Sequence, residues 1–213
     1  MRFRNREHAA QLLVERLRTN LFKHPLVLGV PRGAVPMAKI IAAGLDGELD
    51  VVLVRKLSHP EQAELAIGAV DELGNVFMSD WARDVDPVYL EAEKQRQLEV
   101  LRRRRALYTP ARESVDPKGR IVIVVDDGIA TGSTMTAALR AVRAQKPKRL
   151  IGAVAVASPE AARAMLYECD AMVCLNVPRS FRAVEQFFDD FSQVTDEDVV
   201  KLLRQQTEYS AAS

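Results

Sequence analysis

The sequence predicts an α/β fold in which a mostly parallel sheet is covered by helices on both faces. Continuous apolar runs recur along the chain, helical patterns of apolar residues lie between several of them, and most connections are short. Strands that are covered on both faces lack polar alternation, and repeated strand–helix–strand order favours parallel pairing. A chain of 213 residues can bury one large core, so we expect a single domain over residues 1–213.

The first half of the chain begins with apolar residues at helical spacing, which predict an amphipathic helix over 6–20. A strand is expected at 26–30, and a helix follows Pro31-Arg32-Gly33 and runs to Gly44. The run DVVLV predicts the next strand at 50–54.

The second half contains a long charged helix, expected at 86–108 with Asp86 as its N-cap and Pro87 in its first turn. Three further apolar runs, separated by helical patterns, continue the strand–helix alternation. We expect these strands at 121–125, 150–156 and 171–177, and the helices between them at 133–145 and 159–168.

The composition is that of an ordinary globular domain, with 48% hydrophobic and 28% charged residues. Thirty basic and twenty-nine acidic residues give a formal charge of +1, so there is no whole-chain electrostatic argument for nucleic acid or membrane binding. The charged start lacks a signal-peptide pattern, and no apolar run approaches the roughly 20 residues of a membrane span. We therefore expect a cytoplasmic protein with no nucleic-acid and no membrane partner.

Three features are given structural rather than functional interpretations. Cys169 and Cys174 lie in apolar surroundings and are expected to be reduced thiols, and His8 and His24 lack partners at metal-binding spacing. The four arginines 102–105 lie on a helix that also carries acidic residues, which favours a solvated face or a dimer contact over an RNA-binding site.

The stretch VVDDGIATGST, residues 124–134, follows an apolar strand and leads into a helix, the position where open α/β sheets bind ligands. Its Gly, Thr and Ser residues and the helix N-terminus favour a phosphate group. The spacing excludes a nucleotide P-loop and a dinucleotide fingerprint. Asp126 and Asp127 would repel a polyphosphate but suit sugar hydroxyls or a hydrated Mg²⁺ ion, so a ribose 5-phosphate unit fits.

The segment IVIVVDDGIATGST, residues 121–134, resembles the 5-phosphoribosyl-1-pyrophosphate (PRPP) signature of the type I phosphoribosyltransferases. The resemblance extends, through FRNR at 3–6 and the segment 190–199, to uncharacterised bacterial members of that family. It implies a twisted, mostly parallel sheet with a small C-terminal hood. It also implies that PRPP contacts Arg32, Gly33, Asp126, Asp127, Gly128, Ile129, Ala130, Thr131, Gly132, Ser133 and Thr134.

The resemblance further implies how charge is divided in the reaction. Arg32 and the pair Arg55-Lys56 would meet the leaving pyrophosphate, together with Mg²⁺ as cofactor. Asp126 and Asp127 would hold the ribose hydroxyls and the metal, through water or directly. The expected catalytic residues are Asp126, Asp127, Arg55 and Lys56.

The segment 56–66, KLSHPEQAELA, reads as a long polar connection and resembles a mobile lid of the family. It has fewer glycines than that lid, which argues against free motion. His59 and Glu64 are candidates for proton transfer, although a solvated loop is the alternative for both.

Base recognition is expected in a hood segment at 176–191, where Phe181, Phe187 and Phe188 could stack on a planar base, with Phe181 and Phe188 as the candidate contacts. Aromatic residues at this spacing also suit a core, so the base stays unassigned. Family members that act on 6-oxopurines carry an acid at the position of Ala130, so its absence argues against a hypoxanthine-guanine mechanism.

The function expected from these residues is Mg²⁺-dependent transfer of the 5-phosphoribosyl group of PRPP to a nitrogenous base, with release of pyrophosphate. The alternative is a non-catalytic sensor of PRPP or nucleotides on the same fold. The expected partners are PRPP and a base. A homodimer of this chain is a further possible assembly.

Overall fold

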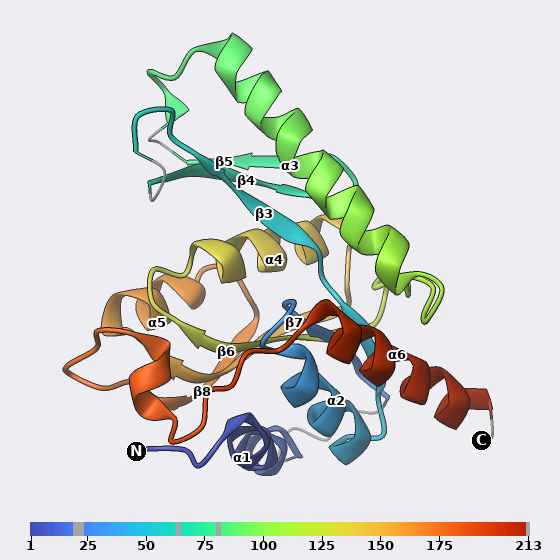
Figure 1. Ribbon diagram of the computed structural model, residues 1–213. Helices are drawn as coiled ribbons and strands as arrows, with labels where there is room; N and C mark the ends of the chain where they lie inside the picture. Colours follow the sequence, from blue (N-terminus) through green and yellow to red (C-terminus); the bar gives the residue numbers. More distant parts are fainter. Residues whose placement is uncertain (19–23, 63–64, 80–81, 212–213) are drawn as a thin grey trace.

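The centre of the protein is a five-stranded sheet in which every neighbouring pair of strands is parallel (Figure 1). The computed structural model describes residues 1–18, 24–62, 65–79 and 82–211. The strand order is β2-β1-β6-β7-β8. The bounds are β1 Leu26–Gly29, β2 Glu48–Val51, β6 Ile121–Ile129, β7 Arg149–Ala157 and β8 Ala171–Asn176.

Helices cover both faces of this sheet because its strands are apolar on both sides, as in β1, where all four residues are buried. Helices α1 and α2 lie on one face and α4 and α5 on the other, while α6 packs beside α2 at the β2 edge (Figure 1). The bounds are α1 Arg6–Arg18, α2 Val35–Gly44, α4 Ser133–Ala144, α5 Pro159–Met165 and α6 Asp196–Ala211. The predicted α/β fold with a mostly parallel sheet is confirmed.

A second, smaller sheet lies above α4 in Figure 1 and is antiparallel, in the order β3-β4-β5. The long helix α3 packs against β3 and β4, and α4 contacts the same two strands. Asp86 caps α3 as predicted, because its carboxylate accepts a hydrogen bond from Val88 N at 2.9 Å. The bounds are β3 Val54–Ser58, β4 Ala66–Asp71, β5 Val76–Met78 and α3 Pro87–Tyr108.

The apolar run at 50–54 is not one strand, and this prediction was wrong. β2 ends at Val51 in the parallel sheet, and β3 begins at Val54 in the small sheet. Val52 and Leu53, between them, are only 6% and 2% exposed. The run is continuously apolar because the chain is buried in both layers and at the crossing between them.

The predicted long connection at 56–66 is shorter in the structure, because β3 continues to Ser58 and β4 starts at Ala66. Among the described residues of the turn, His59 N donates to Leu65 O at 2.9 Å. The segment is thus the connection of an antiparallel hairpin. In the same way β6 is longer than expected and continues through Ile129, because Asp126–Ile129 pairs with β7.

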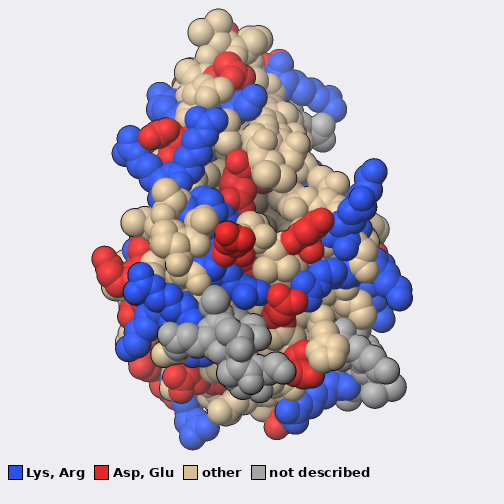
Figure 2. All heavy atoms as spheres, turned by 90° about the vertical axis from the view of Figure 1, so that its right-hand side faces the viewer, with Lys and Arg blue, Asp and Glu red and all other residues tan. Residues whose placement is uncertain are grey.

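The surface that carries α6 mixes both signs of charge, with Lys and Arg side chains interspersed with Asp and Glu (Figure 2). Cys169 and Cys174 are free and partly buried, and burial raises the pKa of both thiols. Within the described ranges, no helix combines the length and the apolar character needed to cross a membrane.

Candidate active site

The two adjacent acids of the sequence motif lie near the carboxyl end of β6, the central strand of the parallel sheet. Asp126 and Asp127 belong to the strand itself, and Asp127 N donates to Asp126 Oδ1 at 2.9 Å. Burial raises the pKa of Asp126, and the charge of Asp127 raises it further. Burial also raises the pKa of Asp127, but there the guanidinium of Arg6 acts in the opposite direction.

Arg6, at the start of α1, pairs with the second acid although the two residues are 121 positions apart in sequence. Its Nε donates to Asp127 Oδ2 at 2.9 Å, and its Nη2 lies 2.9 Å from the same oxygen. Sequence reasoning missed this residue as part of the site. The one sequence feature that involved Arg6 was the FRNR segment, which indicated a resemblance to a family but did not predict a contact with Asp127.

Residues 129–134 connect β6 to α4, and we call them the phosphate loop after the group that they are predicted to bind. Gly132, at the N-cap of α4, has φ +83°, a left-handed conformation that favours glycine. Thr131 Oγ1 and Ser133 Oγ lie 3.2 Å apart at the start of the helix. Two hydroxyls and a helix N-terminus therefore meet where an anion would be stabilised.

The remaining residues of the motif shape the loop. A Cβ at Gly128 would lie 2.6 Å from Val184 Cγ1, so only glycine lets the hood segment approach β6 this closely. Ile129 is buried, and Ala130 and Thr134 are exposed. The carbonyl of Ala130 accepts a hydrogen bond from Ser158 Oγ at 2.7 Å, which ties the loop to the start of α5.

A cavity of about 450 Å³ lies beside the phosphate loop, between α4 and the small sheet. Thr131 and Ser133 line one side of it, and β4 and β5 line the other, with Arg140 contributing a cation. A larger cavity of about 1140 Å³, near the end of α3, is lined by none of the predicted site residues. The cavity at the loop thus contains the two loop hydroxyls among its lining groups.

The 31–34 loop follows β1 and lies next to the acids, because β1 pairs with β6 and Val30 N donates to Val125 O at 2.9 Å. The peptide between Pro31 and Arg32 is cis. A Cβ at Gly33 would lie 2.5 Å from Asp127 Oδ2, so the loop closes directly over the second acid.

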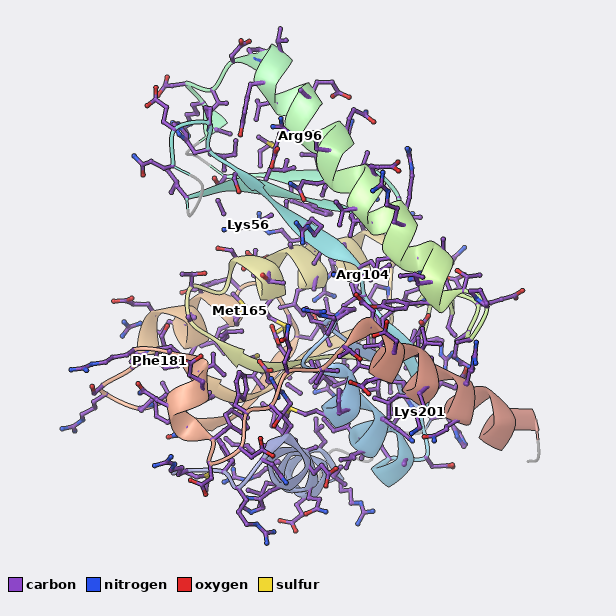
Figure 3. The ribbon with its side chains drawn as sticks, in the orientation of Figure 1. Lys56, Arg96, Arg104, Met165, Phe181 and Lys201 are labelled. Atoms are coloured by element: carbon purple, nitrogen blue, oxygen red, sulfur yellow. The ribbon has the colours of Figure 1, made fainter. Side chains whose placement is uncertain are left out.

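Arg55 and Lys56 were predicted to follow a strand end, but they lie within β3 of the small sheet. The pair is still near the site, because Lys56 and Arg104 lie on the side of this layer that faces the parallel sheet (Figure 3). Arg55 Nε donates to Gln97 Oε1 at 2.8 Å. Burial lowers the pKa of Arg55, and the charge of Arg104 lowers it further.

Asp196, the first residue of α6, joins cations from two elements. Its Oδ2 lies 3.9 Å from Arg32 Nη1, and its Oδ1 lies 3.6 Å from Arg104 Nε. Tyr108 donates its hydroxyl to the same carboxylate, and burial together with Asp196 raises the pKa of this phenol. Arg32 and Arg104 thus share the Asp196 carboxylate, and together with Arg55, which lies within reach of the Arg104 charge, we call them the cationic cluster.

The run of four arginines on α3 is only partly a solvated face, which corrects the prediction. Arg103 is 78% exposed and pairs with Glu99, but Arg104 is 23% exposed and belongs to the cationic cluster. Arg105 is 16% exposed and pairs with Glu72 and Asp50. Helical periodicity turns neighbouring residues to different faces, so a run of like residues need not share one environment.

The hood segment, 176–191, contains the short 3₁₀ helix η2, Val184–Phe187, which contacts β6 and β7. Phe188 cannot stack on a base, contrary to the prediction, because it is 3% exposed and its ring packs against Phe3 and Phe191 at 5.3 and 5.0 Å. Phe181 is half-buried beside Phe187 and keeps its candidate role (Figure 3).

Of the two residues considered for proton transfer, His59 lies in the β3–β4 turn, where its Nδ1 accepts from Glu61 N at 3.2 Å. Glu64 lies outside the described residues. Over the described part of the chain, no three His, Cys, Asp or Glu side chains converge to hold a metal ion.

The model of the phosphoribosyl transferase domain family matches residues 4–192. The chain belongs to the phosphoribosyltransferase family. It is 38% identical over 204 residues to a protein of Mycobacterium tuberculosis named as a phosphoribosyl transferase, with 94% of this chain and 46% of that protein covered. This chain thus spans about half the length of the curated relatives that it matches.

Among solved structures, the protein TT1426 from Thermus thermophilus is similar over 97% of this chain and 99% of its own, with 46% identity and a TM-score of 0.89. This match covers both sheets and the hood segment. The prediction of a type I phosphoribosyltransferase fold is confirmed.

Proposed function

We propose that this phosphoribosyltransferase-family chain transfers the 5-phosphoribosyl group of PRPP to a nitrogenous base and releases pyrophosphate. One observation carries the proposal: the acid pair and the phosphate loop lie consecutively on β6 and α4, with the cationic cluster on the neighbouring elements. A ligand with a phosphate for the loop, vicinal hydroxyls for the acid pair and a pyrophosphate for the cationic cluster matches all three groups of residues.

The separation of charge suits this reaction. Breaking the bond between C1 of the ribose and the pyrophosphate oxygen leaves negative charge on the pyrophosphate and positive charge at the ribose. Arg32, Arg55 and Lys56 would stabilise the leaving group, and Arg104 adds a cation that sequence analysis did not assign. Asp126 and Asp127 would accept hydrogen bonds from the ribose hydroxyls and lie near the developing cation.

Mg²⁺ fits the donor set of this site, because carboxylate oxygens are the protein ligands that it prefers and it usually keeps several waters. Asp126 and Asp127 would hold it, through water, while the substrate supplies the remaining oxygens. The ion would contribute positive charge at the pyrophosphate.

The base stays unidentified. Ala130 presents a methyl group at the loop, which supports the prediction that a hypoxanthine-guanine mechanism is not used. Phe181 is the aromatic residue of the hood segment proposed to lie against the base. The cytoplasmic location, the single domain over 1–213, a role in nucleotide metabolism and a homodimer stay predictions.

The test is incubation of the protein with PRPP, Mg²⁺ and a panel of purines and pyrimidines, with pyrophosphate release as the readout. We expect pyrophosphate release with at least one base. The rate of release should decrease by about 100-fold or more in the Asp126→Asn or Asp127→Asn variant, since electrostatic groups at a reacting centre contribute on this order. Tight PRPP binding without release for any base would favour the sensor. Neither binding nor release would contradict the proposal.

A further inference from the structure

Arg6 is fully engaged at the active site. Besides the two contacts of its guanidinium with Asp127 Oδ2, its Nη1 donates to Ser192 O at 2.7 Å. The guanidinium carbon lies 3.7 Å from the ring centroid of Phe191, a cation–π contact. Arg6 and Asp127 are only 12% and 14% exposed. Each of the three guanidinium nitrogens therefore has an oxygen partner, and one face of the guanidinium packs on an aromatic ring.

The chain before Arg6 is held against the end of the hood segment, so the position of the guanidinium is preorganised. Phe3 N donates to Phe187 O, and Asp189 N donates to Phe3 O, both at 2.8 Å. The ring of Phe3 packs on Phe188 in the core. The N-terminal segment and the hood segment thus form one support on which Arg6 is mounted.

The 31–34 loop packs directly against the second acid. A Cβ at Gly33 would lie 2.5 Å from Asp127 Oδ2 and 3.2 Å from Arg6 Nη2, so the backbone of this loop covers the ion pair. The contacts between Arg6 and Asp127 all involve Oδ2. These contacts fix the orientation of the carboxylate from the side of Oδ2.

We propose that Arg6 is a positioning residue for PRPP binding, which acts by holding the Asp127 carboxylate through Oδ2 in the orientation that the ribose hydroxyls contact. It also reduces the formal charge of the acid pair from −2 to −1, which lessens the repulsion between two neighbouring carboxylates and a substrate that carries phosphates. The N-terminal segment is then part of the active site and not only of the core. This inference rests on the proposed function, because it assumes that the Asp127 carboxylate binds the ribose hydroxyls of PRPP.

The experiment is a double-mutant cycle with the dissociation constant for PRPP, measured by calorimetry in the presence of Mg²⁺, as readout. The variants are Arg6→Ala, Asp127→Asn and the double variant. We expect Arg6→Ala to weaken PRPP binding by about 10- to 100-fold, as expected for loss of a partly buried charge-assisted contact. In the Asp127→Asn background, Arg6→Ala should change the dissociation constant by less than about twofold, because Arg6 acts through the carboxylate.

Arg4→Ala is the matched control, because Arg4 lies on the same segment with an exposed side chain, and its backbone contacts survive the change. It should bind PRPP as the wild type does. Arg6→Lys keeps the charge without the fork of donors, so it should bind with intermediate affinity and also serves if Arg6→Ala does not fold.

Two results would overturn the inference alone: wild-type affinity for PRPP in a folded Arg6→Ala or Arg6→Lys variant, or effects of Arg6→Ala and Asp127→Asn that multiply in the double variant. A wild-type protein that binds no PRPP would overturn the proposed function, and this inference with it.

Discussion

At the scale of single residues, Asp126 is a buried carboxyl group beside a second acid. Burial and the charge of Asp127 raise its pKa above the value in the unfolded chain. A carboxyl group of this kind stabilises the fold fully below its unfolded pKa, and that contribution is lost as pH rises through the folded pKa. At neutral pH, which is above the unfolded pKa, that contribution is reduced, and burying this carboxyl group costs stability.

We accordingly predict that Asp126→Asn raises the Tm at pH 7. The expected increase is about 2–4 °C for each kcal/mol of relieved electrostatic cost in a chain of this length. At a pH near 4, where the wild-type carboxyl group approaches protonation in both states, the difference should shrink. Thermal unfolding followed by circular dichroism at both pH values measures this, and a lower Tm for the variant at pH 7 would count against the prediction.

At the scale of elements, the run of arginines on α3 is divided between the solvent and the proposed site. Its periodicity leaves Arg103 in solvent and brings Arg104 to Asp196 and the cationic cluster. The helix can reach this place because it packs on the small sheet, and it contacts α6 as well. The prediction from charge, a solvated face or a dimer contact, did not distinguish these residues from one another.

The two neighbouring arginines provide a matched comparison. Arg104→Ala should weaken the binding of pyrophosphate by about tenfold, since it removes a cation from a partly buried cluster. Arg103→Ala, which removes an equal charge from the exposed face, should change it by less than about twofold. Pyrophosphate titration by calorimetry distinguishes the two, and equal effects of both variants would show that only the net charge matters.

At the scale of the whole molecule, the small sheet with α3 lies over α4 and the parallel sheet, and the proposed site draws on both layers (Figure 1). The phosphate loop belongs to one layer and Arg55, Lys56 and Arg104 to the other. A ligand that contacts both layers binds the folded protein and not the unfolded chain. Binding should therefore be visible as an increase in global stability.

We expect PRPP at about 100 times its dissociation constant to stabilise the wild-type protein by about 2.7 kcal/mol, with a corresponding rise in Tm. Pyrophosphate alone and ribose 5-phosphate alone, at the same concentration, should each give a smaller shift because each reaches only part of the site. Differential scanning calorimetry provides the measurement. An unchanged Tm at saturating PRPP would contradict binding across the two layers.

The local patterns of the sequence predicted most of the elements and the central chemistry. Apolar runs located β1, β6, β7 and β8, and the capping residue Asp86 located the start of α3. The acid pair, the glycines and the hydroxyl residues of the 124–134 stretch predicted a phosphate-and-ribose site, because strand end, turn and helix N-terminus are all encoded within a few residues. The structure adds that Gly132 is left-handed.

Contacts between distant parts of the chain were decided only by the tertiary structure. One apolar run became two strands in two sheets, Phe188 became core, and Arg6 reached Asp127 across 121 positions. Burial, unlike periodicity, depends on which layers come together, and a single sequence carries no local signal for that. The sequence by itself determined the order of acids, glycines and hydroxyls from which the ligand is predicted, because these residues lie within a few positions of one another, and the tertiary structure decided which distant charges surround them.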